Sequence, residues 1–197
     1  MSRILVVYYT RSGTARTVAG RLAGLLGADL EEIVDPTPRA GWRGFVRSAV
    51  EARRAQLAPI APSQHDPADY DLVVIGTPIW FASVSSPVRA YLRRHRGAIR
   101  AAAFFCTYGG SGSGRVLEQM KAEAKLEPVA RMALREDDLP TVLASLSIER
   151  FASEVRAAPP TLQVVPAVAV AAATPPPTPS SPSSDEGSRR APDLMKH

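Results

Sequence analysis

Continuous apolar runs alternate with amphipathic stretches over residues 1–156. Residues 4–8, 72–76 and 101–106 are apolar without a break, which is typical of strands buried on both faces of a parallel sheet. Residues 29–34 and 129–134 are less apolar and predict two strands at the sheet edges. These five segments predict the central layer of the fold.

Apolar side chains recur at helical spacing between the predicted strands. The stripes are Val18, Leu22, Leu25 and Leu26, then Trp42, Val46, Ala49 and Val50, then Val116, Leu117, Met120 and Ala124. Pro87 suits the first turn of another helix, and residues 146–155 predict the last one. Alternating strands and helices predict an α/β fold whose parallel sheet is covered on both faces.

The composition changes near residue 157. Residues 157–197 contain nine of the eighteen prolines and no aromatic residue, so little apolar surface offsets the entropy of ordering them. We therefore predict one folded domain over residues 1–156 and a disordered Pro/Ser/Ala-rich tail over 157–197. Docking of the apolar stretch 164–168 on the domain or on a partner stays open.

Three short predicted loops, 10–14, 77–81 and 107–112, each follow a predicted strand and precede a predicted helix. Such segments meet at the carboxyl edge of a parallel sheet and line its ligand crevice. The first offers hydroxyls and amides to a phosphate, and the other two offer the rings of Trp80 and Tyr108. The candidate cofactor-binding residues are Thr10, Arg11, Ser12, Gly13, Thr14, Ala15, Thr77, Pro78, Ile79, Trp80, Phe81, Thr107, Tyr108, Gly109, Gly110 and Gly112.

Each segment also has a purely structural interpretation. The first can simply cap a helix, Trp80 and Phe81 can pack under the next helix, and the glycine-rich third can be a flexible loop. Under the functional interpretation, Pro78 directs the residues after it outward over the strand end, and the glycines adopt torsions that bring amides against a ligand.

The three segments resemble the flavodoxin family in order, content and spacing, over about residues 3–156. The resemblance implies a flavodoxin-like three-layer sandwich with a five-stranded parallel sheet of order 2-1-3-4-5, of the short-chain type. It also implies FMN at the strand ends, with Trp80 on one face of the isoalloxazine ring and Thr77 and Pro78 near its edge. The family usually has Asn and then Thr where Thr14 and Ala15 stand, so one expected hydroxyl is missing.

The family implies electron transfer, and we expect a low-potential carrier because aromatic faces and neutral amides disfavour negative charge on a reduced flavin. An NAD(P)H-dependent FMN reductase acting on quinones or similar acceptors is the alternative. A flavodoxin-like module that has lost flavin and only binds a partner is a third interpretation, suggested by Ala15.

The net charge of +5 bears on the partners. Two arginine groups, 43, 47 and 54, and 89, 93, 94, 96 and 100, are candidates for steering an acidic redox donor or acceptor, or reflect composition alone. Arg11 and Arg16 are candidates for additional contacts with the phosphate. Nucleic acid is not an expected partner, because no basic and aromatic reading surface emerges.

The cysteine and histidine content of the chain argues against other kinds of catalytic or metal site. Cys106 is the single cysteine, which excludes an internal disulfide and favours a small buried hydrophobe in a reducing cytoplasm. His65, His95 and His197 are scattered, so we expect neither a catalytic triad nor a metal site. The first apolar run is too short for a signal peptide, and no run is long enough to span a membrane.

Overall fold

The computed structural model describes residues 2–36 and 58–158. Its described elements are β1 (Ile4–Tyr8), α1 (Thr14–Leu26), β2 (Asp29–Glu32), η1 (Pro67–Asp69), β3 (Leu72–Trp80), β4 (Ser83–Val84), α3 (Ser86–Arg94), β5 (Ala102–Tyr108), α4 (Ser113–Ala124), β6 (Arg131–Arg135), η2 (Glu136–Asp138) and α5 (Val142–Ala157). The helix predicted around Trp42 and the tail beyond Ala158 lie outside the described residues, so the 1–156 boundary stays a prediction.

The strands form one sheet in the order β2-β1-β3-β5-β6, and these five are parallel. Counted without β4, this is the predicted order 2-1-3-4-5. The short strand β4 was not predicted, and it pairs antiparallel with the end of β3. Both edge strands are confirmed, because β2 and β6 each pair with one neighbour in the described sheet.

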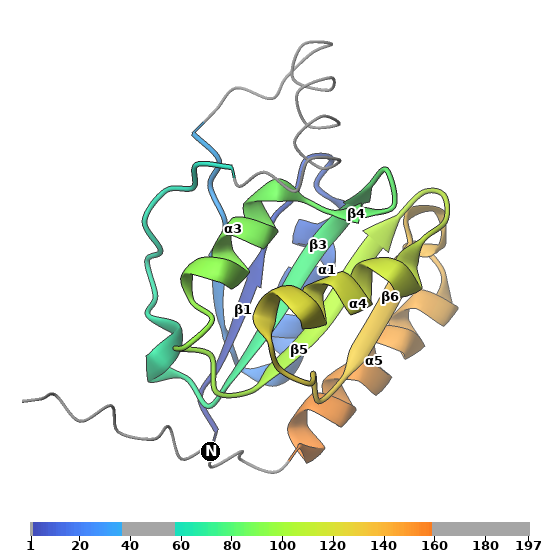
Figure 1. Ribbon diagram of the computed structural model, residues 1–197. Coiled ribbons are helices and arrows are strands. Elements are labelled where there is room, and N and C mark those ends of the chain that lie inside the picture. The colour runs from blue at the N-terminus through green and yellow to red at the C-terminus, as the bar shows by residue number, and fades with distance from the viewer. Residues whose placement is uncertain (1, 37–57, 159–197) are drawn as a thin grey trace, which may run out of the picture. The chain divides into compact units, whose positions relative to one another are not determined.

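Helices cover both faces of the sheet (Figure 1), with α3 and α4 on one face and α1 and α5 on the other. The central strands β1, β3 and β5 are buried on both faces, as their continuous apolar runs predict. The stripe on α4 is fully buried, as predicted. Leu25 on α1 is the exception, since 37% of it is exposed.

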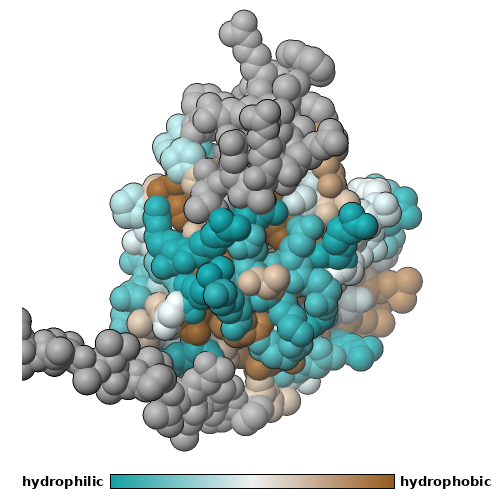
Figure 2. Space-filling view, viewed as in Figure 1, coloured by the Kyte–Doolittle hydropathy of each residue, from teal (hydrophilic) through white to brown (hydrophobic). Residues whose placement is uncertain are grey.

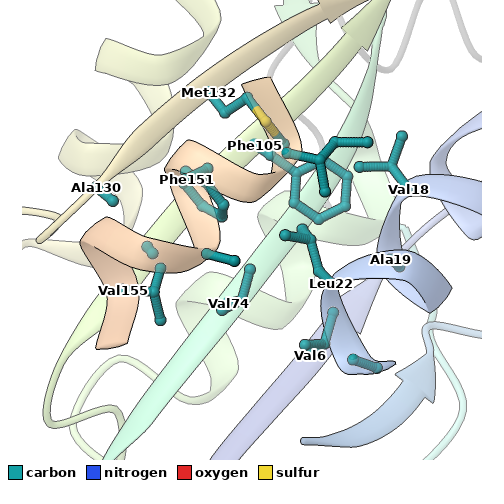
Figure 3. Packing of buried hydrophobic residues seen from close by; sticks show 14 of the residues in the cluster. Val6, Val18, Ala19, Leu22, Val74, Phe105, Ala130, Met132, Phe151 and Val155 are labelled. Atoms are coloured by element: carbon teal, nitrogen blue, oxygen red, sulfur yellow. The ribbon is translucent and has the colours of Figure 1, made fainter. Parts of the chain in front are cut away.

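The core on the α1 and α5 side is built around Phe105, which packs with Leu22, Met132 and Phe151 (Figure 3). The Phe105 ring occupies the space that a side chain at Gly76 would fill, with Cζ 2.0 Å from the ideal Cβ position. Gly76 therefore allows β3 and β5 to pair closely beside a large ring.

Two predicted segments are strands where loops were expected. β3 continues through Pro78 to Trp80, and β5 continues to Tyr108. Pro78 is tolerated because it lies at the last register position that β3 shares with β5. After that position β3 pairs with β4 instead, so Pro78 precedes a hairpin rather than a loop.

Candidate functional site

The three predicted segments begin at one edge of the sheet. In register, Tyr8 of β1 lies beside Gly76 of β3, and Pro78 of β3 lies beside Thr107 of β5. Since these three strands are neighbours and parallel, the chain leaves each of them on the same side of the molecule. The structure thus brings residues 9–13, the β3–β4 hairpin and residues 109–112 together, as the sequence predicts.

The first segment is a compact turn ahead of α1. The Thr10 Oγ1 accepts a hydrogen bond from the Gly13 N–H at 3.0 Å, and the hydroxyl oxygens of Ser12 and Thr14 lie 3.1 Å apart. Gly13 has φ of 92°, a conformation that glycine adopts without steric cost. No atom of the described residues lies within 4 Å of the place where its Cβ would be, so the space beside it is open.

The amino end of α1 is free to hold an anion. Its first turn contains no acidic residue, and no side chain of the described residues caps it. The N–H groups of Thr14, Ala15 and Arg16 have no carbonyl partner within the helix, and the positive end of the helix dipole lies there. A phosphate is the kind of group that such a helix end binds.

Neither Ala15 nor Arg16 offers a side chain to that anion. Ala15 is 1% exposed and packs into the core. The Arg16 guanidinium donates three hydrogen bonds to the Glu32 carboxylate, which also accepts one from the Tyr8 hydroxyl at 2.9 Å. Burial and Glu32 raise the pKa of Tyr8, so its hydroxyl stays a donor to Glu32.

The second segment is a tight hairpin. Trp80 at the end of β3 pairs with Ser83 of β4, and only Phe81 and Ala82 separate them. Both turn residues have positive φ, 48° and 53°, which is the pattern of a type I′ turn. Neither residue is glycine or asparagine, so each costs about 1–3 kcal/mol of backbone strain that the surroundings must offset.

Trp80 connects the hairpin to the first segment. Its ring meets the Tyr9 ring edge to face, with centroids 5.7 Å apart, and the Arg11 guanidinium carbon lies 5.8 Å from the Trp80 centroid. Trp80 is half-buried against the core, whereas Phe81 at the tip is 57% exposed. Sequence analysis missed Tyr9, although its place directly after an apolar strand was a usable signal.

Thr77 and Thr107 point into the protein. The Thr77 hydroxyl lies 3.0 Å from the Ser85 Oγ and accepts a hydrogen bond from the Ser85 N–H at 3.3 Å. Within the described part of the chain, the buried Thr107 Oγ1 has no hydrogen-bond partner. Both side chains are fully buried, so Thr77 stabilises the start of the next helix rather than presenting a hydroxyl at the surface.

The third segment meets the hairpin at Gly112. Gly112 has φ of 101°, and a Cβ there would lie 2.8 Å from the Ala82 Cβ, so glycine permits this close contact. Gly109 and Gly110 are exposed with open space beside them, but their φ values are not in the left-handed region. The prediction of unusual glycine torsions is therefore correct for Gly112 and wrong for Gly109 and Gly110. Tyr108 is half-buried ahead of them.

Three of the five arginines predicted as a basic surface at 89–100 are ion-paired with Glu123, and of these only Arg89 is buried. Arg89 is 3% exposed, and Arg89, Arg93 and Arg96 all approach the Glu123 carboxylate, with shortest distances of 3.2, 2.6 and 3.9 Å. Arg89 is therefore not a docking residue. Hydrophilic residues predominate on the face covered by α3 and α4 (Figure 2), and Arg94 and Arg100 are exposed. The group at 43, 47 and 54 lies outside the described residues.

Other candidate chemistry is weak in residues 2–36 and 58–158, where no group of three or more His, Cys, Asp and Glu could hold a metal ion. Burial raises the pKa of the Cys106 thiol to about 12, as expected of a buried hydrophobe. His95 contacts the Ser63 hydroxyl, and His65 contacts the Tyr70 hydroxyl. Over the same residues, every helix is too short or too polar for a bilayer span.

A cavity of about 340 Å³ lies at the opposite edge of the sheet. Leu26, Leu72, Ala101 and Val155 line it, near the amino ends of the strands. It is distant from the three segments, because parallel strands run between the two edges. We assign the candidate site to the carboxyl edge, where polar donors, aromatic rings and a free helix end converge.

Known proteins resemble this chain in sequence and in fold. An NAD(P)H dehydrogenase (quinone) from Cupriavidus metallidurans is 29% identical over 131 residues, a match that covers 64% of this chain and 63% of the relative. The chain therefore spans less than two thirds of the length of that curated relative. The family model for flavodoxin matches residues 3–133.

Two solved structures show the same fold. A flavoprotein from Lactobacillus acidophilus in complex with FMN has a TM-score of 0.60 at 20% identity, covering 71% of this chain and 97% of that one. The two-electron reduced flavodoxin of Megasphaera elsdenii has a TM-score of 0.52 at 16% identity, covering 79% and 99%. Because the family match spans more than half of the chain and the sheet has the order implied for that family, this protein belongs to the flavodoxin family.

Proposed function

We propose that this protein binds FMN at the carboxyl edge of its sheet and acts in electron transfer. The observation that carries the proposal is the meeting of three segments there: the open amino end of α1, the Trp80 hairpin and the turn at Gly112. Membership of the flavodoxin family and the FMN complex of the Lactobacillus flavoprotein support the choice of cofactor.

The phosphate of FMN is assigned to the amino end of α1. The N–H groups of Thr14, Ala15 and Arg16 and the hydroxyls of Ser12 and Thr14 are its donors, and the bare Gly13 lets the phosphate approach the backbone. Thr10 keeps the turn closed through its bond from the Gly13 N–H. This arrangement needs no lysine and tolerates the missing hydroxyl at Ala15, whose backbone still donates.

The isoalloxazine ring is assigned to the surface near Trp80 and Tyr108, beside the contact between the hairpin and Gly112. Trp80 and Tyr108 are the aromatic side chains for its two faces, and Gly109 and Gly110 leave room for its edge. FMN supplies the redox chemistry when bound, and the protein sets its affinity and potential. Aromatic rings and neutral amides around the ring favour a low potential.

A second candidate function is NAD(P)H-dependent reduction of a quinone. The relative in Cupriavidus that bears the name NAD(P)H dehydrogenase (quinone) favours it. Both functions require FMN, and they differ in whether the protein takes hydride from a nicotinamide itself or receives electrons from another protein.

One pair of measurements tests the proposal. Purified protein is titrated with FMN, and the flavin absorbance and fluorescence are followed. Saturable binding is expected, and a spectrum that does not change from that of free FMN overturns the assignment. The holoprotein is then mixed with NADPH or NADH and a quinone. Reduction of the quinone assigns the reductase activity, whereas inactivity combined with reduction by a separate flavodoxin reductase assigns the carrier role.

A further inference from the structure

A buried charged network lies behind the Trp80 hairpin. Arg89 of α3 is 3% exposed, and its Nη2 donates a hydrogen bond to the Ser83 Oγ at 2.9 Å. Its Nε lies 3.2 Å from a Glu123 carboxylate oxygen on α4. Burial lowers the pKa of Arg89, and Glu123 opposes this effect, so the guanidinium keeps its charge. Ser83 is therefore held by a fixed cation in the protein interior.

A second side chain holds the same short strand. The Gln119 Oε1 of α4 accepts hydrogen bonds from the Val84 N–H at 3.0 Å and from the Ser83 Oγ at 3.3 Å. Arg89 and Gln119 come from different helices and meet at the Ser83 hydroxyl. The two residues of β4 are thus fixed from both helices that cover this face of the sheet.

The hairpin depends on such external contacts. Trp80 is the direct partner of Ser83 across the hairpin, so the position of Ser83 fixes where the Trp80 backbone lies. The turn residues Phe81 and Ala82 both have left-handed torsions that they do not prefer. We expect a turn of this kind to relax when its flanking strand is released, and the Trp80 ring to shift with it.

A contribution to stability does not by itself explain why a charged Arg89 is buried behind the hairpin. Within the described residues, the buried Nε and Nη1 of Arg89 have no hydrogen-bond partner, although Nε lies within ion-pair distance of Glu123. Glu123 is also paired with Arg93 and Arg96. A buried ion pair of this kind is often no more stabilising than an apolar side chain of similar size. What Arg89 adds, and Arg93 and Arg96 do not, is its bond to Ser83.

We propose that Arg89 is a positioning residue of the flavin site, holding Ser83 so that the strained turn presents Trp80 to the isoalloxazine ring. The role rests on the proposed FMN binding. Arg89 does not reach the cofactor itself. It acts through Ser83 and the hairpin, while Glu123 keeps its guanidinium in place.

The test compares R89M with R93M, a matched control that also removes one cation from Glu123 but leaves the bond to Ser83. R89M is expected to raise the Kd for FMN about tenfold, because the displaced Trp80 ring no longer stacks well on the flavin, and R93M to stay within about twofold. At saturating FMN, R89M is also expected to quench the flavin fluorescence less than the wild type, because Trp80 is displaced. R89K, which keeps the charge, is expected to recover part of the affinity.

Further variants keep the result decisive. S83A removes the acceptor of the Arg89 hydrogen bond, so it replaces R89M in the test if R89M does not fold. S83A is likewise expected to bind FMN more weakly than the wild type. A merely structural role would lower the melting temperature of R89M but leave the Kd and the quenching unchanged below the transition, and this result overturns the proposal. A wild-type protein that does not bind FMN overturns the proposed function itself, and the positioning role falls with it.

Discussion

Replacing Ser12 with aspartate should change the stability of the protein and its affinity for FMN in opposite directions. Ser12 is exposed and lies just before α1, with its hydroxyl 3.1 Å from that of Thr14. The first turn of α1 contains no acidic residue to interact with the helix dipole. We expect S12D to raise the free energy of unfolding of the apoprotein by about 0.3–1 kcal/mol.

The same change is expected to weaken FMN binding. A phosphate that accepts from both hydroxyls would lie about 4 Å from the new carboxylate, where two like unit charges repel by about 1 kcal/mol in bulk water and about 4 kcal/mol near a protein surface. Because Ser12 is exposed, the lower half of this range applies, and the Kd for FMN should rise about fivefold to seventyfold. S12N, which has the same shape without the charge, should bind nearly as the wild type does.

Riboflavin provides the discriminating assay, because it has the ring and the ribityl chain but no phosphate. Titration of flavin fluorescence should show that S12D weakens binding of FMN and leaves the affinity for riboflavin within about twofold. Chemical unfolding of the apoprotein should give the opposite sign, a gain in stability. Equal losses for FMN and riboflavin, or an FMN affinity unchanged by the charge, would refute the placement of the phosphate at α1.

Three further predictions concern the scaffold. G76A should destabilise the fold by about 1–3 kcal/mol or more, because its Cβ would meet the Phe105 ring; urea unfolding measures the loss, and an unchanged midpoint would contradict the close packing. Burial and Arg94 lower the pKa of His95 from 6.5. The neutral His95 therefore contributes its full stability above about pH 6.5, and this contribution is lost as the pH falls through the lowered pKa. H95Q should therefore lose less stability than the wild type between about pH 7 and about pH 5, and equal slopes would argue against this contribution. Cys106 should resist a thiol reagent in the native protein, since burial raises its pKa to about 12, and should react when the protein is unfolded in denaturant. Rapid labelling of the native protein would show instead that the strand is accessible.

The sequence predicted the parts of the fold that local pattern determines. The apolar run of β1 matches the strand residue for residue, since a strand buried on both faces requires an unbroken apolar segment. Pro87 correctly predicted the first turn of α3 because its fixed φ suits that place. The order of the five parallel strands came from the resemblance to the flavodoxins, because local pattern does not specify which strands become neighbours.

The parts that the sequence did not predict depend on distant partners. The type I′ turn carries none of the Asn or Gly residues that signal it, because Phe81 and Ala82 are held by β4 and Gly112. Arg89 belongs to an arginine-rich stretch typical of a solvated helix face, but it is buried, with Glu123 and Ser83 as its polar partners. The contacts of Trp80 with Tyr9 and Arg11 likewise join segments that are far apart in sequence.

The most direct test of the account is a titration of isotope-labelled protein with FMN, followed by the chemical shifts of the backbone amides. We expect the largest changes at Gly13, Thr14 and Ala15, in the Trp80 hairpin and around Gly112, with little change at the opposite edge around Gly27 and Ala101. Shifts that cluster at that opposite edge, or amides of α1 that do not respond at saturating FMN, would contradict a flavin site built at the carboxyl ends of β1, β3 and β5.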